Sequence, residues 1–197
     1  MKPGREIRIE DYLGTKTLIL GDVNTGKTYW TRGILAAMCR QGLGARMAIV
    51  DMAPEIPENI ARERGLPGAG GKLTPPEGQE VLYLGGHFAA PRLSSKTEEE
   101  ALAKARQNRQ DIASLFPRLP GQDRDILFVN DISMVLQAGR AEDLIPWLDG
   151  AATVVANGYW GEKLGGGILT RWERAEMEKL TVYFKAKGQV LKSLRHR

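Results

Sequence analysis

The stretch that decides the fold is Thr17-Leu18-Ile19-Leu20 followed by Gly21-Asp22-Val23-Asn24-Thr25-Gly26-Lys27-Thr28. Its first four residues predict a buried strand, and the glycines that follow predict a tight turn. Residues 27–40 then place apolar side chains at helical spacing, and Gly42 ends that pattern. The sequence therefore predicts a strand, a turn and a helix in direct succession.

The turn itself matches the pattern G-x-x-x-x-G-K-[ST] at every fixed position. Glycine lets the backbone curve so that its N–H groups converge on an anion, and the N-terminal end of the next helix adds positive charge. Lys27 would reach the β- and γ-phosphates, and the Thr28 hydroxyl would bind Mg²⁺. The residues expected to hold the nucleotide are Gly21, Asp22, Val23, Asn24, Thr25, Gly26, Lys27 and Thr28.

This motif, between an apolar strand and an amphipathic helix, resembles the P-loop NTPase superfamily. The resemblance implies an α/β three-layer sandwich with a mostly parallel sheet and the P-loop at the carboxyl end of its first strand. It also implies a nucleoside triphosphate and Mg²⁺ as ligands. A guanine-reading N-K-x-D motif does not occur in the sequence, so ATP is preferred over GTP.

Further elements follow along the chain. Thr97 with Glu100, and Thr170 with Glu173, form capping-box patterns that predict two helix starts. The alternation of apolar runs and helical patterns predicts a mainly parallel sheet in a single domain over residues 1–197. Short apolar runs predict strands at residues 47–50, 81–84, 126–129, 153–156 and 181–184.

The run at residues 126–129 ends in Asn130-Asp131. P-loop proteins carry an aspartate at the end of a buried strand that holds Mg²⁺ directly or through water. If Asp131 fills this position, no acid follows it. If Asn130 does, Asp131 takes the place where many ATPases carry a water-activating glutamate. Lys27 and Asp131 are the predicted catalytic residues in both registers, and Thr28, Asp131 and Asn130 are the candidate metal ligands; a turn-capping role is the structural alternative for Asp131.

Other polar residues follow strand ends. Asn157 lies where RecA-like ATPases often place a γ-phosphate sensor, so it is a candidate nucleotide contact. Asp51 ends the run at residues 47–50 and is either a site acid or a turn former. Arg171 and Arg174 could clamp phosphates or form surface ion pairs.

Two glycine-rich segments, residues 53–78 and 157–167, show no clear pattern. Loops of this length in a compact domain are often lids or binding loops. Tyr159 and Trp160 in the second segment would stack on adenine, cover an acceptor, or pack onto the domain. We expect this segment to become more ordered when nucleotide binds.

Charge and composition set further expectations. The net charge is +4, yet residues 179–197 carry six basic side chains and no acid, so the rest of the chain sums to −2. The basic C-terminal end, residues 185–197, could bind nucleic acid or could be a solvated terminus. Cys39 is the only cysteine, which indicates a reducing compartment. With no apolar run near the ~18 residues that span a bilayer and no signal peptide, we expect a cytoplasmic protein without a membrane partner.

From residue 17 to 156 the layout is also similar to the ATP:corrinoid adenosyltransferases. The shared features are an early P-loop, a Gly42-Leu43-Gly44 turn, and the spacing of Leu136 and Gly139 after the acid pair. That family has more glycine and lysine in its P-loop, and its acid pair is Asp-Glu rather than Asn130-Asp131.

Three functions are compatible with these observations. The first is a MgATP-binding ATPase or nucleotide-dependent switch. The second is an ATP-dependent transferase, a kinase or adenosyltransferase, with an unknown acceptor under residues 53–78 or 157–167. The third is a non-catalytic nucleotide-binding module that carries a protein or nucleic-acid partner on its basic end. We expect the first, with ATP and Mg²⁺ as its cofactors.

Overall fold

The computed structural model of the chain describes residues 7–66, 69–120 and 123–193. Within these ranges six parallel strands form one sheet in the order β3-β2-β4-β5-β1-β6. The α/β class and the parallel sheet expected from the sequence are therefore confirmed. The strands are β1 (Lys16–Gly21), β2 (Met47–Asp51), β3 (Leu82–Gly85), β4 (Ile126–Asn130), β5 (Thr153–Tyr159) and β6 (Gly188–Lys192).

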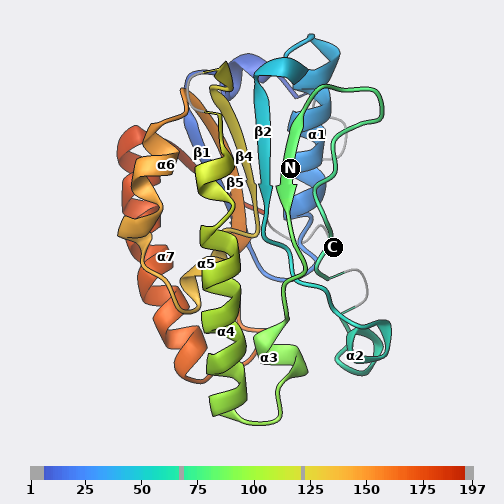
Figure 1. Cartoon of the computed structure of the whole chain (residues 1–197), viewed down its shortest axis with the longest axis vertical. Helices are drawn as coiled ribbons and strands as arrows, with labels where there is room; N and C mark the ends of the chain where they lie inside the picture. The colour runs from blue at the N-terminus through green and yellow to red at the C-terminus, as the bar shows by residue number, and fades with distance from the viewer. Residues whose placement is uncertain (1–6, 67–68, 121–122, 194–197) are drawn as a thin grey trace.

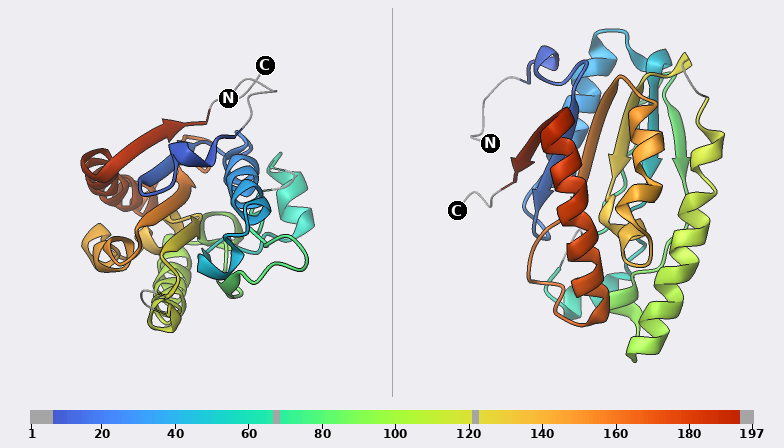
Figure 2. Two further views of the ribbon diagram at one scale, coloured as in Figure 1. Left: turned by 90° about the horizontal axis from the view of Figure 1, so that it is seen from above. Right: turned by 90° about the vertical axis from the view of Figure 1, so that its left-hand side faces the viewer.

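Helices cover both faces of the sheet, which makes three layers (Figures 1 and 2). On one face Ile34, Leu35 and Met38 of α1 pack against strand residues such as Ile19 and Phe128. The other core cluster contains the alternate strand residues together with side chains of α4 to α7. The helices are α1 (Lys27–Arg40), α2 (Glu58–Glu63), α3 (Pro91–Ser94), α4 (Glu98–Ala113), α5 (Ser133–Leu136), α6 (Ile145–Asp149) and α7 (Ile168–Lys187), with short 3₁₀ turns at Ile9–Asp11, Gly44–Arg46, Phe116–Arg118 and Ala141–Asp143.

The strand order brings the two predicted halves of the site together. β1, which leads into the glycine turn, pairs with β5, and β5 pairs with β4, which carries Asn130-Asp131. One strand therefore separates the turn from the candidate acid. Because every strand runs the same way, all carboxyl ends meet at one edge, where open α/β sheets bind their ligands.

The C-terminal part of the chain corrects one prediction. The strand expected at residues 181–184 is wrong, because α7 continues unbroken to Lys187. Met177, Leu180 and Phe184 are all buried, and their spacing of three and four residues is helical rather than alternating. The last strand is instead β6, an edge strand that pairs only with β1 and whose apolar side chains are half-buried.

The two capping-box predictions differ in outcome. Thr97 Oγ1 accepts a hydrogen bond from the Glu100 backbone N–H at 3.2 Å, and α4 begins at the next residue as expected. The second pattern is wrong, because α7 begins at Ile168 and Thr170 already lies in its first turn. Glu173 points into the molecule, where it pairs with Arg92.

Two of the six basic side chains in residues 179–197 lie beside acidic neighbours. Lys179 forms ion pairs with Glu142 and Glu176, and Lys187 lies 3.9 Å from Asp149. Residues 194–197, which hold two of the predicted basic residues, lie outside the described ranges. Within those ranges, no helix has the length and apolar character that a bilayer crossing requires.

Candidate functional site

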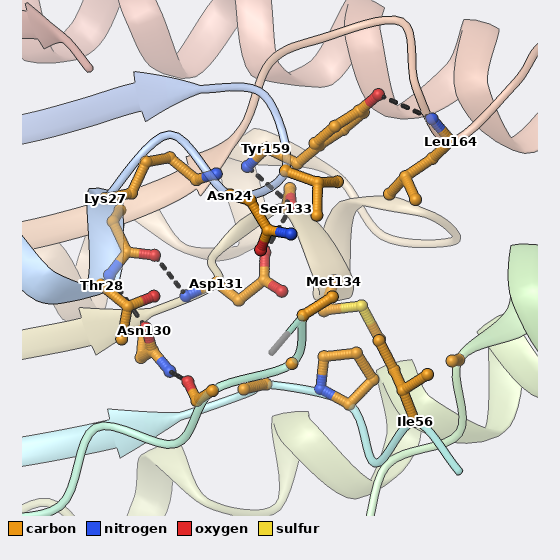
Figure 3. Close-up of a pocket in the computed structure, with 18 of the residues that line it drawn as sticks. Asn24, Lys27, Thr28, Ile56, Asn130, Asp131, Ser133, Met134, Tyr159 and Leu164 are labelled. Atoms are coloured by element: carbon orange, nitrogen blue, oxygen red, sulfur yellow. Dashed lines mark hydrogen bonds between the residues drawn. The ribbon is translucent and has the colours of Figure 1, made fainter. Parts of the chain in front are cut away.

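A cavity of about 450 Å³ opens at the carboxyl ends of the central strands, a size within the ~300–1,000 Å³ typical of small-molecule sites. Figure 3 shows Lys27 and Thr28 on one side of it, Ile56, Met134 and Leu164 towards the other, and Asp131 between them. The lining residues come from six segments, which are residues 23–32, 53–56, 69–71, 90–93, 130–137 and 157–164.

The glycine turn is held by hydrogen bonds between its own residues. Lys27 Nζ donates to the Asp22 carbonyl at 2.7 Å, and Thr25 Oγ1 donates to the same oxygen at 2.9 Å. The Asp22 carboxylate accepts from the Val23 N–H at 2.6 Å. Asn24 and Gly26 have φ values of 59° and 89°. Left-handed residues within such a turn produce the concave row of N–H groups that binds anions.

One distant residue also supports the turn. Ser193, which follows β6, donates from Oγ to the Thr25 carbonyl at 2.5 Å, and its N–H donates to the Leu20 carbonyl at 2.7 Å. A Cβ added to Gly21 would lie 2.5 Å from Thr25 Oγ1 and 2.6 Å from the Ser193 carbonyl. Glycine is therefore required at this position by close packing, in addition to its role in the turn.

Lys27 and Asp131 influence each other across the cavity. Burial lowers the pKa of Lys27, and the negative charges of Asp131 and Asp22 oppose this shift. Burial raises the pKa of Asp131, while Lys27, the Ser133 hydroxyl and Arg92 act in the opposite direction. Ser133 Oγ donates to Asp131 Oδ1 at 2.9 Å. Asp131 also has a φ of 56°, a backbone conformation that is uncommon for residues other than glycine and recurs at functional sites.

The neighbouring Asn130 is held inside the protein. It is 1% exposed, and its amide nitrogen donates to Asp51 Oδ1 at 2.9 Å and to the Gly71 carbonyl at 3.0 Å. Its side-chain oxygen accepts from Asn157 Nδ2 at 2.9 Å. Asn130 and Asp131 both line the cavity, but the side chain of Asn130 is already bound at both ends of its amide.

Asn157 holds the backbone at Asp131 in place. It is 1% exposed, and its side-chain oxygen accepts from the Asp131 N–H at 3.1 Å. Its amide nitrogen donates to Thr31 Oγ1 at 3.0 Å as well as to Asn130. Asn157 lines the cavity, but these bonds already involve both ends of its amide. Its role as a γ-phosphate sensor stays a prediction.

Asp51 anchors a segment that covers the cavity. Residues 69–73, here called the roof, cross the carboxyl ends of β2 and β4. Asp51 is fully buried and accepts from the N–H groups of Leu73 and Ala53, from the Tyr83 hydroxyl and from Asn130. With four donors on one carboxylate, Asp51 has a structural role in holding the roof.

Lys72 and Arg32 complete this attachment. Lys72 Nζ donates to the carbonyls of Ala53 at 2.8 Å and Gly86 at 2.9 Å, and Arg32 donates to the Lys72 carbonyl at 2.8 Å. Part of the segment at residues 53–78, which showed no pattern in the sequence, is therefore bound to three neighbouring elements.

An ion pair that sequence reasoning missed lies beside the cavity. Arg92 of α3 lines the cavity and pairs with Glu173 of α7, and both side chains are at least nine-tenths buried. The Arg92 guanidinium also stacks 5.2 Å above the ring of Tyr159. Burial raises the pKa of Glu173 to about 7, although Arg92 acts to lower it. The helical spacing of Glu173 with the buried residues of α7 was the available sequence signal.

The arginines chosen from the sequence lie elsewhere. Arg171 is exposed and does not line the cavity. Arg174 stacks 5.5 Å above Trp160 and donates to the Gly161 carbonyl at 3.1 Å. Trp160 packs against the core, while Tyr159 is part of β5 and lines the cavity. The two aromatic rings therefore do not form one stacking surface.

The donor set fits a magnesium-bound nucleotide. Val23, Asn24, Thr25, Gly26, Lys27, Thr28, Asn130, Asp131 and Asn157 all line the cavity, whereas Gly21 and Asp22 shape the turn from behind. In the described ranges no group of three or more His, Cys, Asp or Glu residues could hold a metal by itself. Mg²⁺ commonly binds through one or two protein oxygens and completes its shell with phosphate oxygens and water. Thr28 and Asp131 offer such oxygens.

Comparisons with known proteins relate the chain to others by structure rather than by sequence. No protein-family model matches it, and no curated protein matches it. Among solved structures it is similar to the flagellar accessory protein FlaH from Methanocaldococcus jannaschii. That likeness covers 84% of this chain and 69% of that chain, with 12% sequence identity and a TM-score of 0.40.

Proposed function

We propose that the cavity binds MgATP and that the protein is an ATPase, in which water attacks the γ-phosphate. The observation that carries this proposal is that Lys27, at the start of α1, and Asp131, directly after β4, line one cavity beside a glycine turn of anion-binding shape. The preference for ATP follows from the sequence alone.

Each residue has a defined task in this proposal. Lys27 leaves the Asp22 carbonyl and bonds the β- and γ-phosphates, while the N–H groups of the turn surround them. Thr28 and Asp131 would hold Mg²⁺, which when bound would offset the charge that develops on the phosphates. Asp131 would also orient the attacking water, and burial raises its pKa above the ordinary aspartate value, which makes it a better proton acceptor.

The experiment that tests this function is a calorimetric titration of MgATP into wild type and Lys27→Ala. The variant should bind at least about 100-fold more weakly, because two or more charge-assisted hydrogen bonds are lost. It should remain folded, since Lys27 bonds only to the turn itself. Lys185→Ala, which removes an exposed lysine of α7, is the matched control. Equal affinity in folded Lys27→Ala would refute the proposal.

A further inference from the structure

The cavity extends beyond the residues that the proposed nucleotide uses. Its side away from Lys27, here called the apolar end, is lined by Ile56, Leu93, Met134 and Leu164. Figure 3 shows three of these side chains directed into the cavity from separate elements, on the far side of Asp131 from Thr28. Apolar walls with a few placed polar groups are the usual composition of a small-molecule site.

One polar side chain that lines the cavity has an atom without a partner. Gln137 follows α5, is 4% exposed, and lines both this cavity and a second pocket beside α4 and α7. Its Oε1 is one of two buried side-chain oxygens in the described residues that have no hydrogen-bond partner. A buried acceptor in this state carries a desolvation penalty, so a native example calls for an explanation such as a ligand.

The contacts of the Gln137 amide nitrogen determine which way this side-chain amide points. The Gln137 amide nitrogen hydrogen-bonds to Glu173, and it lies 3.5 Å from Met134 Sδ. The ionised form of Glu173, which prevails above its pKa of about 7, only accepts hydrogen bonds and so keeps the nitrogen on that side. The oxygen is then the group that remains for a ligand, and its complement is an N–H or O–H donor.

We propose that the apolar end is a binding site for a second small molecule, with an apolar body and a hydroxyl or amino group that donates to Gln137. The body of the ligand is uncharged, because Arg92, the lining cation that precedes Leu93, is already paired with Glu173. The position relative to the nucleotide rests on the proposed function. The acid that holds Mg²⁺ marks the γ-phosphate, and the apolar end lies beyond it.

Two probes that differ by one donor test this site. Benzyl alcohol and benzyl methyl ether share the same ring, but only the alcohol can donate a hydrogen bond. Titrations followed by NMR should give wild type a preference of about fivefold for the alcohol, the usual scale of one hydrogen bond. Gln137→Leu should remove the preference. Gln107→Leu, which replaces an exposed glutamine that lines neither this cavity nor the second pocket, should keep it.

Further experiments test whether this site is distinct from the nucleotide site. Ile56→Trp, a substitution in a loop, should block both probes by filling the apolar end. A saturating non-hydrolysable ATP analogue should leave the affinity for benzyl alcohol within about twofold, and so should Lys27→Ala. Equal affinity of wild type for the two probes, an unchanged preference in Gln137→Leu, or displacement of the alcohol by the analogue would each overturn the proposal. Failure of wild type to bind MgATP would refute the proposed function and leave the probe results standing.

Discussion

The two sides of the cavity are built in different ways. The glycine turn is eight consecutive residues, and most of its bonds join positions within five residues of one another. The roof is attached through residues that are far away in sequence. Leu73 bonds Asp51, Arg32 bonds Lys72 over 40 residues, and Asn130 bonds Gly71 over 59. The turn is therefore specified locally, whereas the roof depends on strand order.

Asp131 lies where these two sides meet, and its replacement should have the largest effect on turnover. Asp131→Asn should lower phosphate release about 10²–10⁴-fold, the usual contribution of a positioned acid or base. The same variant should unfold at a higher temperature at pH 7. Burial raises the folded-state pKa of Asp131, so stability falls as the pH rises from its ordinary pKa through the folded one. Asparagine stays neutral and avoids this loss.

Asn130→Asp is the matched comparison for that result. Its new carboxylate would face Asp51, so it should destabilise the protein without raising turnover. Increased turnover in Asn130→Asp would instead mean that Asn130 occupies the metal position. Unchanged phosphate release in Asp131→Asn would assign the acid role to another residue.

Asp51→Asn should separate the roof from the turn. One carboxylate oxygen accepts from Ala53 and Asn130, and the other accepts from Leu73 and Tyr83. An amide nitrogen in either place would leave two donors without an acceptor, so we expect a loss of about 3 kcal/mol in the free energy of unfolding. Denaturant unfolding measures this loss. Hydrogen exchange should show faster opening of residues 69–73 than of residues 21–28.

The control is Asp111→Asn, which changes an exposed carboxylate of α4 that accepts only from Gln107. It should alter stability by less than about 0.5 kcal/mol. Equal protection of residues 69–73 in wild type and Asp51→Asn would show that the bonds of Lys72, Arg32 and Asn130 hold the roof without Asp51.

The sequence predicted the parts of the fold and site that depend on short-range patterns. The glycine turn, its strand and helix, the run ending in Asn130-Asp131 and the start of α4 at Thr97 all have local signals. Asn157 was chosen from its place at a strand end, but its bonds to Asn130 and Thr31 depend on the pairing of β4, β5 and α1. No local pattern contains that information.

The wrong and the missing predictions also concern features that depend on contacts between distant parts of the sequence. Residues 181–184 have strand-like composition, but the apolar positions of α7 continue at helical spacing through Phe184 and are buried against the sheet. Arg92 and Glu173 lie 81 residues apart, so their pairing is visible only once α3 and α7 meet. The roof is the extreme case, since the two glycines in its sequence, Gly70 and Gly71, indicate only an irregular segment.

Glu173 offers a smaller effect that is specific to pH. Burial raises its folded-state pKa to about 7, whereas glutamate ordinarily titrates near 4.3. The folded state therefore keeps a proton that the unfolded state has lost, and stability declines as the pH rises through this window. Relative to Glu173→Gln, wild type should lose up to about 1.4 kcal/mol per pH unit between those values. Denaturant unfolding at several pH values measures the difference.

Glu178→Gln, on the exposed side of the same helix, is the control and should show no such divergence. If wild type and Glu173→Gln keep a constant difference from pH 4.5 to 7, the carboxyl group of Glu173 titrates normally, and Arg92 outweighs burial.

Ser193→Ala should have the smallest effect. It tests whether the glycine turn keeps its shape without a contact from a residue far away in sequence. Ser193 provides the shorter of two long-range side-chain bonds described for this turn, from Oγ to the Thr25 carbonyl at 2.5 Å, while the Glu162 N–H donates to the Asp22 carboxylate at 3.5 Å. A single hydrogen bond contributes about 1 kcal/mol, so MgATP should bind about fivefold more weakly while Asp51→Asn changes the affinity less. Ser114→Ala, which removes an exposed hydroxyl at the end of α4, is the control for the calorimetric titration. Unchanged affinity in Ser193→Ala would mean that residues 21–28 hold their shape without β6. A loss of MgATP affinity as large as that of Lys27→Ala would mean that the turn needs the edge strand β6 to keep its shape, as the roof needs Asp51.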